Sequence, residues 1–193
     1  LVPPQQLPMT AVDRWIEFMP NTIWIYLSEY VFFVSVYLMC HDMRNLNKFF
    51  YSFMSLQIVS CAIFVLWPTT YPRHEFPLPE DLNALSHYFF STLRATDTPA
   101  NCCPSLHVSS VFLCVFIYLE EQRKLFPFFL VWGLAIAFST LTTKQHYFID
   151  VVTGILTAVI TYWVFHRLVS YRALPERALS RSVRGLLGIQ LKR

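Results

Sequence analysis

The fold is decided by residues 125–143, which read LFPFFLVWGLAIAFSTLTT and include no charged side chain. A bilayer hydrocarbon core of about 30 Å is crossed by a helix of about 20 apolar residues, with a range of about 17–25. The stretch has this length, and Pro127 falls in its first turn, where a missing backbone N–H costs little. Residues 125–143 therefore predict a membrane-spanning helix.

Further apolar runs with at most one charged side chain lie before and after this stretch. They are residues 23–40, 49–67, 106–119 and 147–164. A buried helix of a soluble protein explains one such run but not five. The prediction is an all-α, polytopic integral membrane bundle with five spans. The count becomes six if another span precedes Leu1, which is not a Met.

The composition agrees with a membrane protein. Hydrophobic residues make up 55% of the 193 residues and charged residues only 14%, whereas a soluble domain has about 25% charged residues. This composition argues against a soluble domain, and the apolar content excludes a disordered chain. The net charge of +3 is too small to indicate nucleic-acid binding, and five scattered cysteines form no disulfide framework.

The longest connection, residues 68–105, contains an amphipathic segment. Apolar residues recur at helical spacing from Leu82 to Leu93. Residues 80–94 therefore predict a helix on the membrane surface. Such a helix is a candidate lid over a site that a lipid enters sideways from the bilayer.

Basic residues are divided unequally between the two sides of the five-span topology. The loops at 39–48 and 120–124 and the C-terminal tail together carry 11 of the 15 Lys and Arg residues. By the positive-inside rule this side is cytoplasmic. We therefore expect a membrane-embedded domain at residues 1–170 and a basic cytoplasmic tail at residues 171–193.

Residues that can carry chemistry gather on the other side, which is periplasmic, lumenal or extracellular. His146 and Asp150 begin the fifth span four positions apart, so they share a helix face and can hydrogen-bond. An Asp inside a span is costly unless it has a partner. His107 lies in the first turn of the third span, where free N–H groups favour an anion. Three cations lie on the same side: Arg73, Arg94 and Lys144. The set indicates a phosphate site with a histidine nucleophile.

Two motifs carry a resemblance to a known family. Pro-Ser-Leu-His at 104–107 resembles the second signature of the type 2 phosphatidic acid phosphatase superfamily, Pro-Ser-Gly-His. Ser139-x6-His146-x3-Asp150 resembles the third signature, Ser-Arg-x5-His-x3-Asp. Leu106 and the run at 146–150 are similar to the branch of inositol phosphorylceramide synthases and sphingomyelin synthases.

The resemblance implies metal-independent phosphoryl transfer on a lipid phosphate or phospholipid, without a cofactor. His146 would attack phosphorus and form a phosphohistidine, Asp150 would hold the ring of His146, and His107 would protonate the leaving group. Other residues would hold the phosphate: Ser105, Arg73 and Lys144, with Ser139 and Arg94 as weaker candidates.

The sequence departs from the family pattern in its cations. The first signature, Lys-x6-Arg-Pro, is absent, since Leu66 stands at the Lys position and His74 follows Arg73 in place of Pro. The Arg of the third signature is Thr140. A site with fewer cations suits a phosphodiester better than a monoester, which favours head-group transfer.

Structural alternatives remain for these residues. The His-x3-Asp spacing also suits zinc on a helix, and Glu29 lies mid-span without an assigned role. The alternatives for the weaker candidates are interface anchoring for Arg73 and Lys144, a surface pair with Asp97 for Arg94, N-capping for Ser105 and helix packing for Ser139.

Two classes of function follow. A membrane enzyme would be a phosphatase if water is the acceptor and a transferase if a lipid alcohol is the acceptor. The rival is a small membrane transporter, which predicts polar residues at mid-membrane or paired broken helices. The ionisable residues gather at one face instead, and this favours the enzyme.

Overall fold

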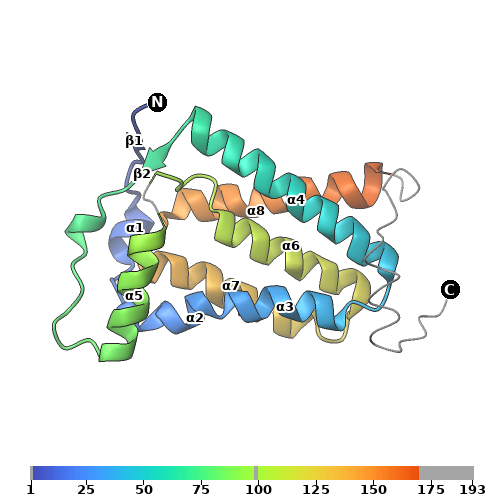
Figure 1. Ribbon diagram of the computed structural model, residues 1–193, viewed down its shortest axis with the longest axis horizontal. Coiled ribbons are helices and arrows are strands. Elements are labelled where there is room, and N and C mark those ends of the chain that lie inside the picture. The colour runs from blue at the N-terminus through green and yellow to red at the C-terminus, as the bar shows by residue number, and fades with distance from the viewer. Residues whose placement is uncertain (1, 98–99, 170–193) are drawn as a thin grey trace.

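The computed structural model describes residues 2–97 and 100–169. The predicted basic tail at 171–193 and its boundary lie outside the described residues. Figure 1 shows helices running back and forth along the long axis, with α1 and α5 at one end. The α-helices are α1 (Ala11–Trp15), α2 (Ile23–Leu27), α3 (Glu29–Met39), α4 (Met43–Leu66), α5 (Ala84–Thr96), α6 (Leu106–Glu121), α7 (Phe126–Thr142) and α8 (Phe148–Trp163). The smaller elements are β1 (Gln5–Gln6), β2 (Thr69–Thr70), the 3₁₀ turns Pro20–Thr22 and Arg73–Glu75, and a π-helical turn at Val164–Leu168.

Helical segments of membrane-spanning size support an integral membrane protein. Three described segments are long and apolar enough to cross a membrane: Pro20–Met39, Met43–Leu66 and Phe148–Leu168. The helix α7 has 17 residues and α6 has 16, so α6 is about 24 Å long at about 1.5 Å per residue. The structure therefore supports three of the predicted spans, and the five-span topology stays a prediction.

The short helix α6 is the centre of the bundle. It packs against α3, α4, α7 and α8, and most of its side chains are buried. Figure 1 shows α6 between the longer helices. Other helices surround α6 on most sides. The neighbouring helices, and not α6, therefore provide most of the surface that faces the lipid.

The outer face of the bundle is apolar. Large hydrophobic side chains that would be unusual on a soluble surface are exposed there, among them Val31, Leu38, Ile58, Val65, Leu66, Phe128, Val131 and Ile160. This surface is what a lipid-facing bundle requires.

The predicted helix of the long connection is present as α5, which starts four residues later than expected. Asn83 caps it, because its Oδ1 accepts a hydrogen bond from Ser86 N at 2.9 Å. The predicted apolar face is divided: Leu93 is buried, whereas Leu85 is 57% and Phe89 37% exposed. The helix lies across the end of the bundle in Figure 1, so part of its apolar side faces outward.

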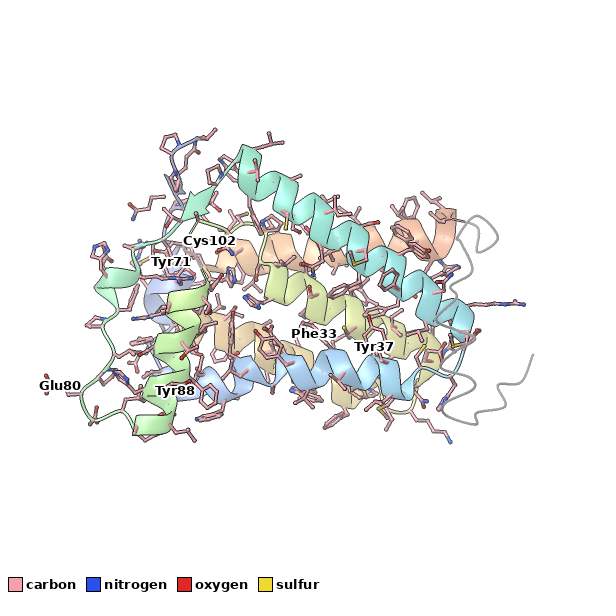
Figure 2. All side chains as sticks on the ribbon, in the orientation of Figure 1. Phe33, Tyr37, Tyr71, Glu80, Tyr88 and Cys102 are labelled. Carbon is pink, nitrogen blue, oxygen red and sulfur yellow. The ribbon has the colours of Figure 1, made fainter. Side chains whose placement is uncertain are left out.

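The same end holds a small cluster that joins distant parts of the chain. The strands β1 and β2 pair in parallel, with Gln5 opposite Thr69. Leu7, Tyr71 and Tyr147 pack there with the two adjacent cysteines of the α5–α6 connection. Figure 2 shows Tyr71 and Cys102 close to the start of α6. This cluster brings the N-terminal segment to the start of α8.

The helices α6 and α8 approach closely at this end. Gly154 has no side chain, and a Cβ there would come within 2.8 Å of the Ser105 backbone oxygen and 3.2 Å of Val108 Cβ. Ser105 N donates to Asp150 O at 3.1 Å. The two helix starts that carry the predicted histidine and aspartate motifs are therefore held together.

Candidate active site

A tight turn after α7 places His146. Lys144 N donates to Leu141 O at 3.2 Å and Gln145 N to Thr140 O at 3.0 Å, which is the Schellman pattern of helix termination. Lys144 has φ 51°, in the left-handed region that usually requires glycine. His146 N also donates to Thr140 O, at 3.2 Å. The backbone of His146 is thus fixed by the end of α7.

The ring of His146 is held through one nitrogen and left open at the other. Its Nδ1 lies 3.1 Å from Cys102 O and 3.4 Å from Asp150 Oδ2. Both oxygens can only accept, so Nδ1 carries the proton and Nε2 has the lone pair. Among the described residues, Nε2 is buried and has no hydrogen-bond partner. This is the tautomer that a histidine nucleophile needs.

Asp150 is completely buried and serves its own helix as well as His146. Its Oδ2 accepts from Tyr147 N at 2.8 Å, in the first turn of α8. Its Oδ1 has no partner in the described part of the chain. The predicted i,i+4 pair of His146 and Asp150 is present in the structure.

His107 faces His146 and has a carboxylate of its own. The two rings lie 5.7 Å apart between centroids. His107 Nδ1 donates to the carboxylate of Glu29, at 2.8 Å from Oε1 and 3.1 Å from Oε2. The ring of Tyr26 packs against His107 at 4.9 Å. The site therefore holds two histidines, each oriented by a buried acid from a different helix.

Arg73 lies near the histidines but is already paired. Its guanidinium donates to Asp97 Oδ2 at 3.0 Å, to Asp97 O and to the hydroxyl of Tyr71. Burial lowers the pKa of Arg73, but Tyr71 and Asp97 outweigh this effect and raise it overall. Arg73 and Asp97 both act electrostatically on His107. The suggested pairing of Asp97 with Arg94 is wrong, since Asp97 binds Arg73.

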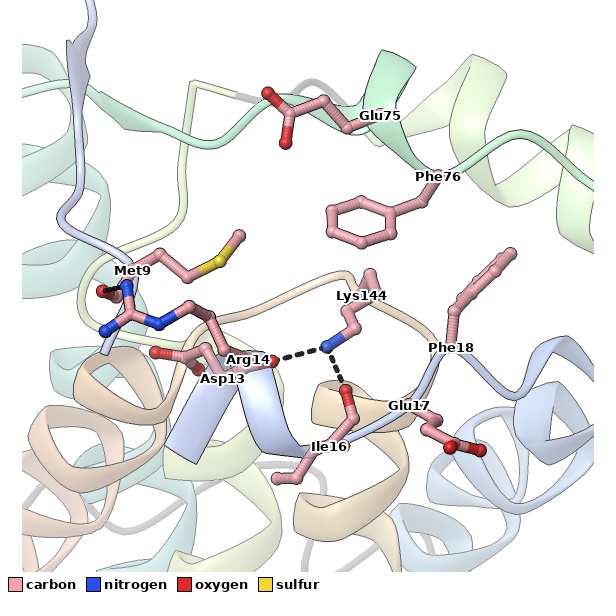
Figure 3. Close-up of a pocket in the computed structure, with 9 residues that line it drawn as sticks. All are labelled: Met9, Asp13, Arg14, Ile16, Glu17, Phe18, Glu75, Phe76 and Lys144. Atoms are coloured by element: carbon pink, nitrogen blue, oxygen red, sulfur yellow. Dashed lines mark hydrogen bonds between the residues drawn. The ribbon is translucent and has the colours of Figure 1, made fainter. Parts of the chain in front are cut away.

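Lys144 does not extend to the histidines. Its Nζ donates to two carbonyl groups of the α1 segment, Asp13 O at 2.8 Å and Ile16 O at 2.5 Å. Burial lowers the pKa of Lys144, and the charge of Asp13 opposes this effect. Figure 3 shows the ammonium group at the wall of a cavity of about 380 Å³ between α1, Glu75 and Phe76. The structure gives no support to the predicted phosphate-binding role, because the ammonium group of Lys144 donates to these two carbonyl groups.

The remaining predicted phosphate ligands make structural contacts. The hydroxyl of Ser105 accepts from Val108 N at 3.3 Å as the N-cap of α6. The hydroxyl of Ser139 donates to Ile136 O at 2.6 Å within α7. Arg94 donates to a backbone oxygen at 2.8 Å and lies over an aromatic ring of its own helix at 4.7 Å. The structure does not bring Ser139 or Arg94 into contact with the histidines.

Two acidic residues of the site were not identified from the sequence. Glu29 was visible only as a charge inside an apolar run, and its partner is 78 residues away. Asp13 is buried and accepts from Phe148 N, in the first turn of α8, at 2.7 Å. The only local signal for Asp13 is the capping-box spacing Thr10-x-x-Asp13.

The described residues contain no group of three or more His, Cys, Asp and Glu side chains that could hold a metal ion. The zinc alternative thus has no ligand set within residues 2–97 and 100–169.

Fold and site together define a helical membrane protein with two histidine–carboxylate pairs at one end of its bundle. Residues 6–164 match the family model of the PAP2 superfamily. The chain belongs to this superfamily, as the motifs predicted, and its members are generally phosphatases or phosphotransferases. Comparisons with curated proteins and with solved structures give no match. The resemblance to the inositol phosphorylceramide synthase and sphingomyelin synthase branch stays a prediction.

Proposed function

We propose that this protein is a lipid phosphatase or phospho-head-group transferase that works through a phosphohistidine on His146. The carrying observation is the Nε2 atom of His146, which is buried and has no hydrogen-bond partner among the described residues, while Nδ1 donates to Cys102 O and lies 3.4 Å from Asp150 Oδ2. An imidazole whose Nε2 carries the lone pair can attack phosphorus.

The first step transfers the phosphoryl group to the enzyme. The lone pair of His146 Nε2 forms a bond to phosphorus, and the bond from phosphorus to the leaving oxygen breaks. His107 gives its proton to that oxygen, and Glu29 stabilises the protonated form of His107 before the transfer. Asp150 balances the positive charge that develops on His146.

The second step returns the enzyme to its starting state. An acceptor oxygen attacks phosphorus, the phosphorus–nitrogen bond breaks, and His107 takes the proton of the acceptor. Water gives a phosphatase, and a lipid alcohol gives a transferase. The salt bridge between Arg73 and Asp97 supports the transferase, since a paired arginine suits a phosphodiester with one negative charge.

The substrate is proposed to be a lipid phosphate or phospholipid that enters from the bilayer. The apolar outer surface and the crossing helix α5 support this entry, with α5 as the lid. The site is proposed to face the periplasm, the lumen or the exterior, because 11 of the 15 Lys and Arg residues of the sequence lie in the loops at 39–48 and 120–124 and in the C-terminal tail, which the five-span topology puts on the opposite side.

The test uses the purified protein in detergent with a panel of lipid phosphates and phosphodiesters, with products followed by mass spectrometry. His146→Ala should abolish turnover and the acid-labile phosphoprotein, and Asp150→Asn should lower the rate by about 10²–10⁴-fold because it removes the charge behind the nucleophile.

His41→Ala is the matched control, because His41 is an exposed histidine of the α3–α4 loop at the opposite end of the bundle. Near-normal turnover in His146→Ala would refute the mechanism. A chelator should leave the wild-type rate unchanged, and a loss of activity that zinc restores would favour the metal alternative.

A further inference from the structure

We infer that Asp13 is a positioning residue for His146, and that α1 acts through it to fix the nucleophile. This inference rests on the proposed function of His146. The residue is remote in sequence, and its carboxylate touches neither histidine. It acts on the segment that carries His146 from both sides.

The first argument is the bracketing of His146 by α1. Lys144 precedes His146 by two positions, and its Nζ donates to Asp13 O at 2.8 Å and Ile16 O at 2.5 Å. Phe148 follows by two positions, and its N–H donates to Asp13 Oδ1 at 2.7 Å. Figure 3 shows Asp13 and Lys144 meeting beside α1. The nucleophile therefore lies between two anchor points on the same five-residue helix.

The second argument is the burial of the Asp13 carboxylate. Its exposed fraction is 4%, and a buried charge is costly unless each oxygen has a partner. Oδ2 accepts from Thr10 N at 2.8 Å and from Thr10 Oγ1 at 2.6 Å, which leaves Oδ1 for Phe148. The carboxylate thus joins the first turns of two helices, α1 and α8. A residue that only capped α1 would not need to be buried against α8.

The third argument is the strain in the turn before His146, which the backbone oxygens of Asp13 and Ile16 support through Lys144. Lys144 occupies the left-handed region at φ 51°, which disfavours a residue with a side chain. The hydrogen bonds of its ammonium to α1 help to hold this conformation. If α1 is released, the turn can relax and His146 moves, and a misplacement of about 1 Å can cost about 10²-fold in rate.

The experiment compares Asp13→Asn, Asp13→Ala and the matched control Thr10→Val, each as the full chain in detergent. Thr10→Val removes the hydroxyl from the capping box of α1 but leaves the contact of Asp13 with Phe148. We expect the rate of phosphohistidine formation to fall by about 10–10²-fold in Asp13→Ala. Asp13→Asn should lie between Asp13→Ala and the wild type, because an amide oxygen can still accept from Phe148. The KM should stay within about threefold in all three variants, because Asp13 touches no substrate.

A second readout does not depend on turnover. In protein labelled with ¹⁵N-histidine, the His146 ring signals are identified by their absence in His146→Ala. They should shift or broaden in Asp13→Ala and stay in place in Thr10→Val. Unchanged His146 signals in Asp13→Ala, or equal rate losses in Asp13→Ala and Thr10→Val, would overturn the inference. A wild-type protein that forms no phosphohistidine would refute the proposed function, while shifted His146 signals would still support the positioning by Asp13.

Discussion

At the scale of single residues, reactivity depends on which atom of each histidine is free. His146 and His107 each place Nδ1 against a buried carboxylate, from Asp150 and Glu29 respectively. An acid at Nδ1 fixes the tautomer and favours positive charge on the ring. His146 must gain positive charge as it attacks, whereas His107 must hold a proton until the leaving oxygen takes it. The same arrangement thus serves a nucleophile and an acid.

Glu29→Gln should shift the pH profile of the reaction. The negative charge of Glu29 favours the protonated form of His107, so its removal lets His107 lose the proton at lower pH. The alkaline limb of kcat/KM should therefore move to lower pH, and the loss should be largest with a poor leaving group. In the described part of the chain, Asp97 and Arg73 also act electrostatically on His107 and form a salt bridge with each other, and the rings of Tyr26 and His146 pack against it.

The control is Glu120→Gln, since Glu120 accepts a hydrogen bond from Tyr162 at the far end of the bundle. A pH profile in Glu29→Gln that matches the profile of Glu120→Gln would show that Glu29 does not act on His107. An activated substrate such as a nitrophenyl ester should be affected much less, because its leaving group departs without a proton.

Lys144 provides a prediction that separates a structural role from phosphate binding. Lys144→Ala loses both hydrogen bonds to α1 and keeps the left-handed backbone, so it should be destabilised by about 1–3 kcal/mol. Lys144→Gly should be more stable than Lys144→Ala by about 1 kcal/mol, because glycine adopts φ 51° without penalty. The measurement is thermal unfolding in detergent. A strongly raised KM in both variants would return Lys144 to the phosphate site.

The sequence was informative for residues whose partners are close along the chain. His146 and Asp150 are four positions apart in the sequence, so helical spacing predicts their contact, although His146 lies in the turn before α8. Glu29 and His107 are brought together by packing between α3 and α6, and no local pattern encodes that contact. The phosphate-binding role of Lys144 was predicted from its charge and position, whereas the direction of its side chain depends on its contacts with α1.

At the scale of elements, the site depends on how closely α6 approaches α8. These helices carry His107 and the His146–Asp150 motif at their first turns, and Gly154 allows their backbones to meet. The long apolar helices were predictable from hydrophobicity, but the distance between α6 and α8 depends on a single missing side chain. The N-terminal helix α1 was too short for its role to be read from periodicity.

Gly154→Ala should reduce activity although alanine favours a helix. The new Cβ would meet the Ser105 backbone oxygen at 2.8 Å, and a backbone atom cannot rotate away. The start of α6 should move from α8, with a stability cost of about 1–3 kcal/mol and a fall in kcat of about tenfold or more. Measurements of kcat and of thermal unfolding together test this.

Gly133→Ala is the matched control for this change. Its Cβ would meet side-chain methyl groups of Val115 and Val111, at 2.8 and 3.3 Å, within the α6–α7 contact. It can cost stability, but it should leave kcat within about threefold, because it lies away from the two helix starts. Equal loss of kcat in both variants would show that general packing, and not the α6–α8 approach, sets the rate.

At the scale of the whole molecule, the helices alternate in direction, so one end collects every part of the site. The connection from β2 to α6 and the turn after α7 meet there, while the α3–α4 and α6–α7 loops lie at the other end (Figure 1). Hydrophobic runs and basic loops predict this arrangement because insertion into a bilayer depends on those same properties. The three segments of spanning size support the membrane assignment, and the side on which the site lies requires an experiment.

That experiment is labelling of single cysteines at Glu80 and Lys124, which are exposed at opposite ends of the described bundle. Cys40 and Cys61 are replaced by serine first, because the other cysteines are buried. In intact, right-side-out vesicles, a membrane-impermeant maleimide should label position 80, and position 124 should react only after the membrane is opened. This result follows if α2–α3, α4, α6, α7 and α8 all cross, because the α6–α7 loop is then on the side rich in Lys and Arg. Labelling of both positions in sealed vesicles would mean that positions 80 and 124 lie on the same side of the membrane, so that α6 does not cross it. The site could then not be assigned to the non-cytoplasmic face. Labelling of position 124 alone would keep the five crossings but invert them, and the lipid would then be processed in the cytoplasmic leaflet.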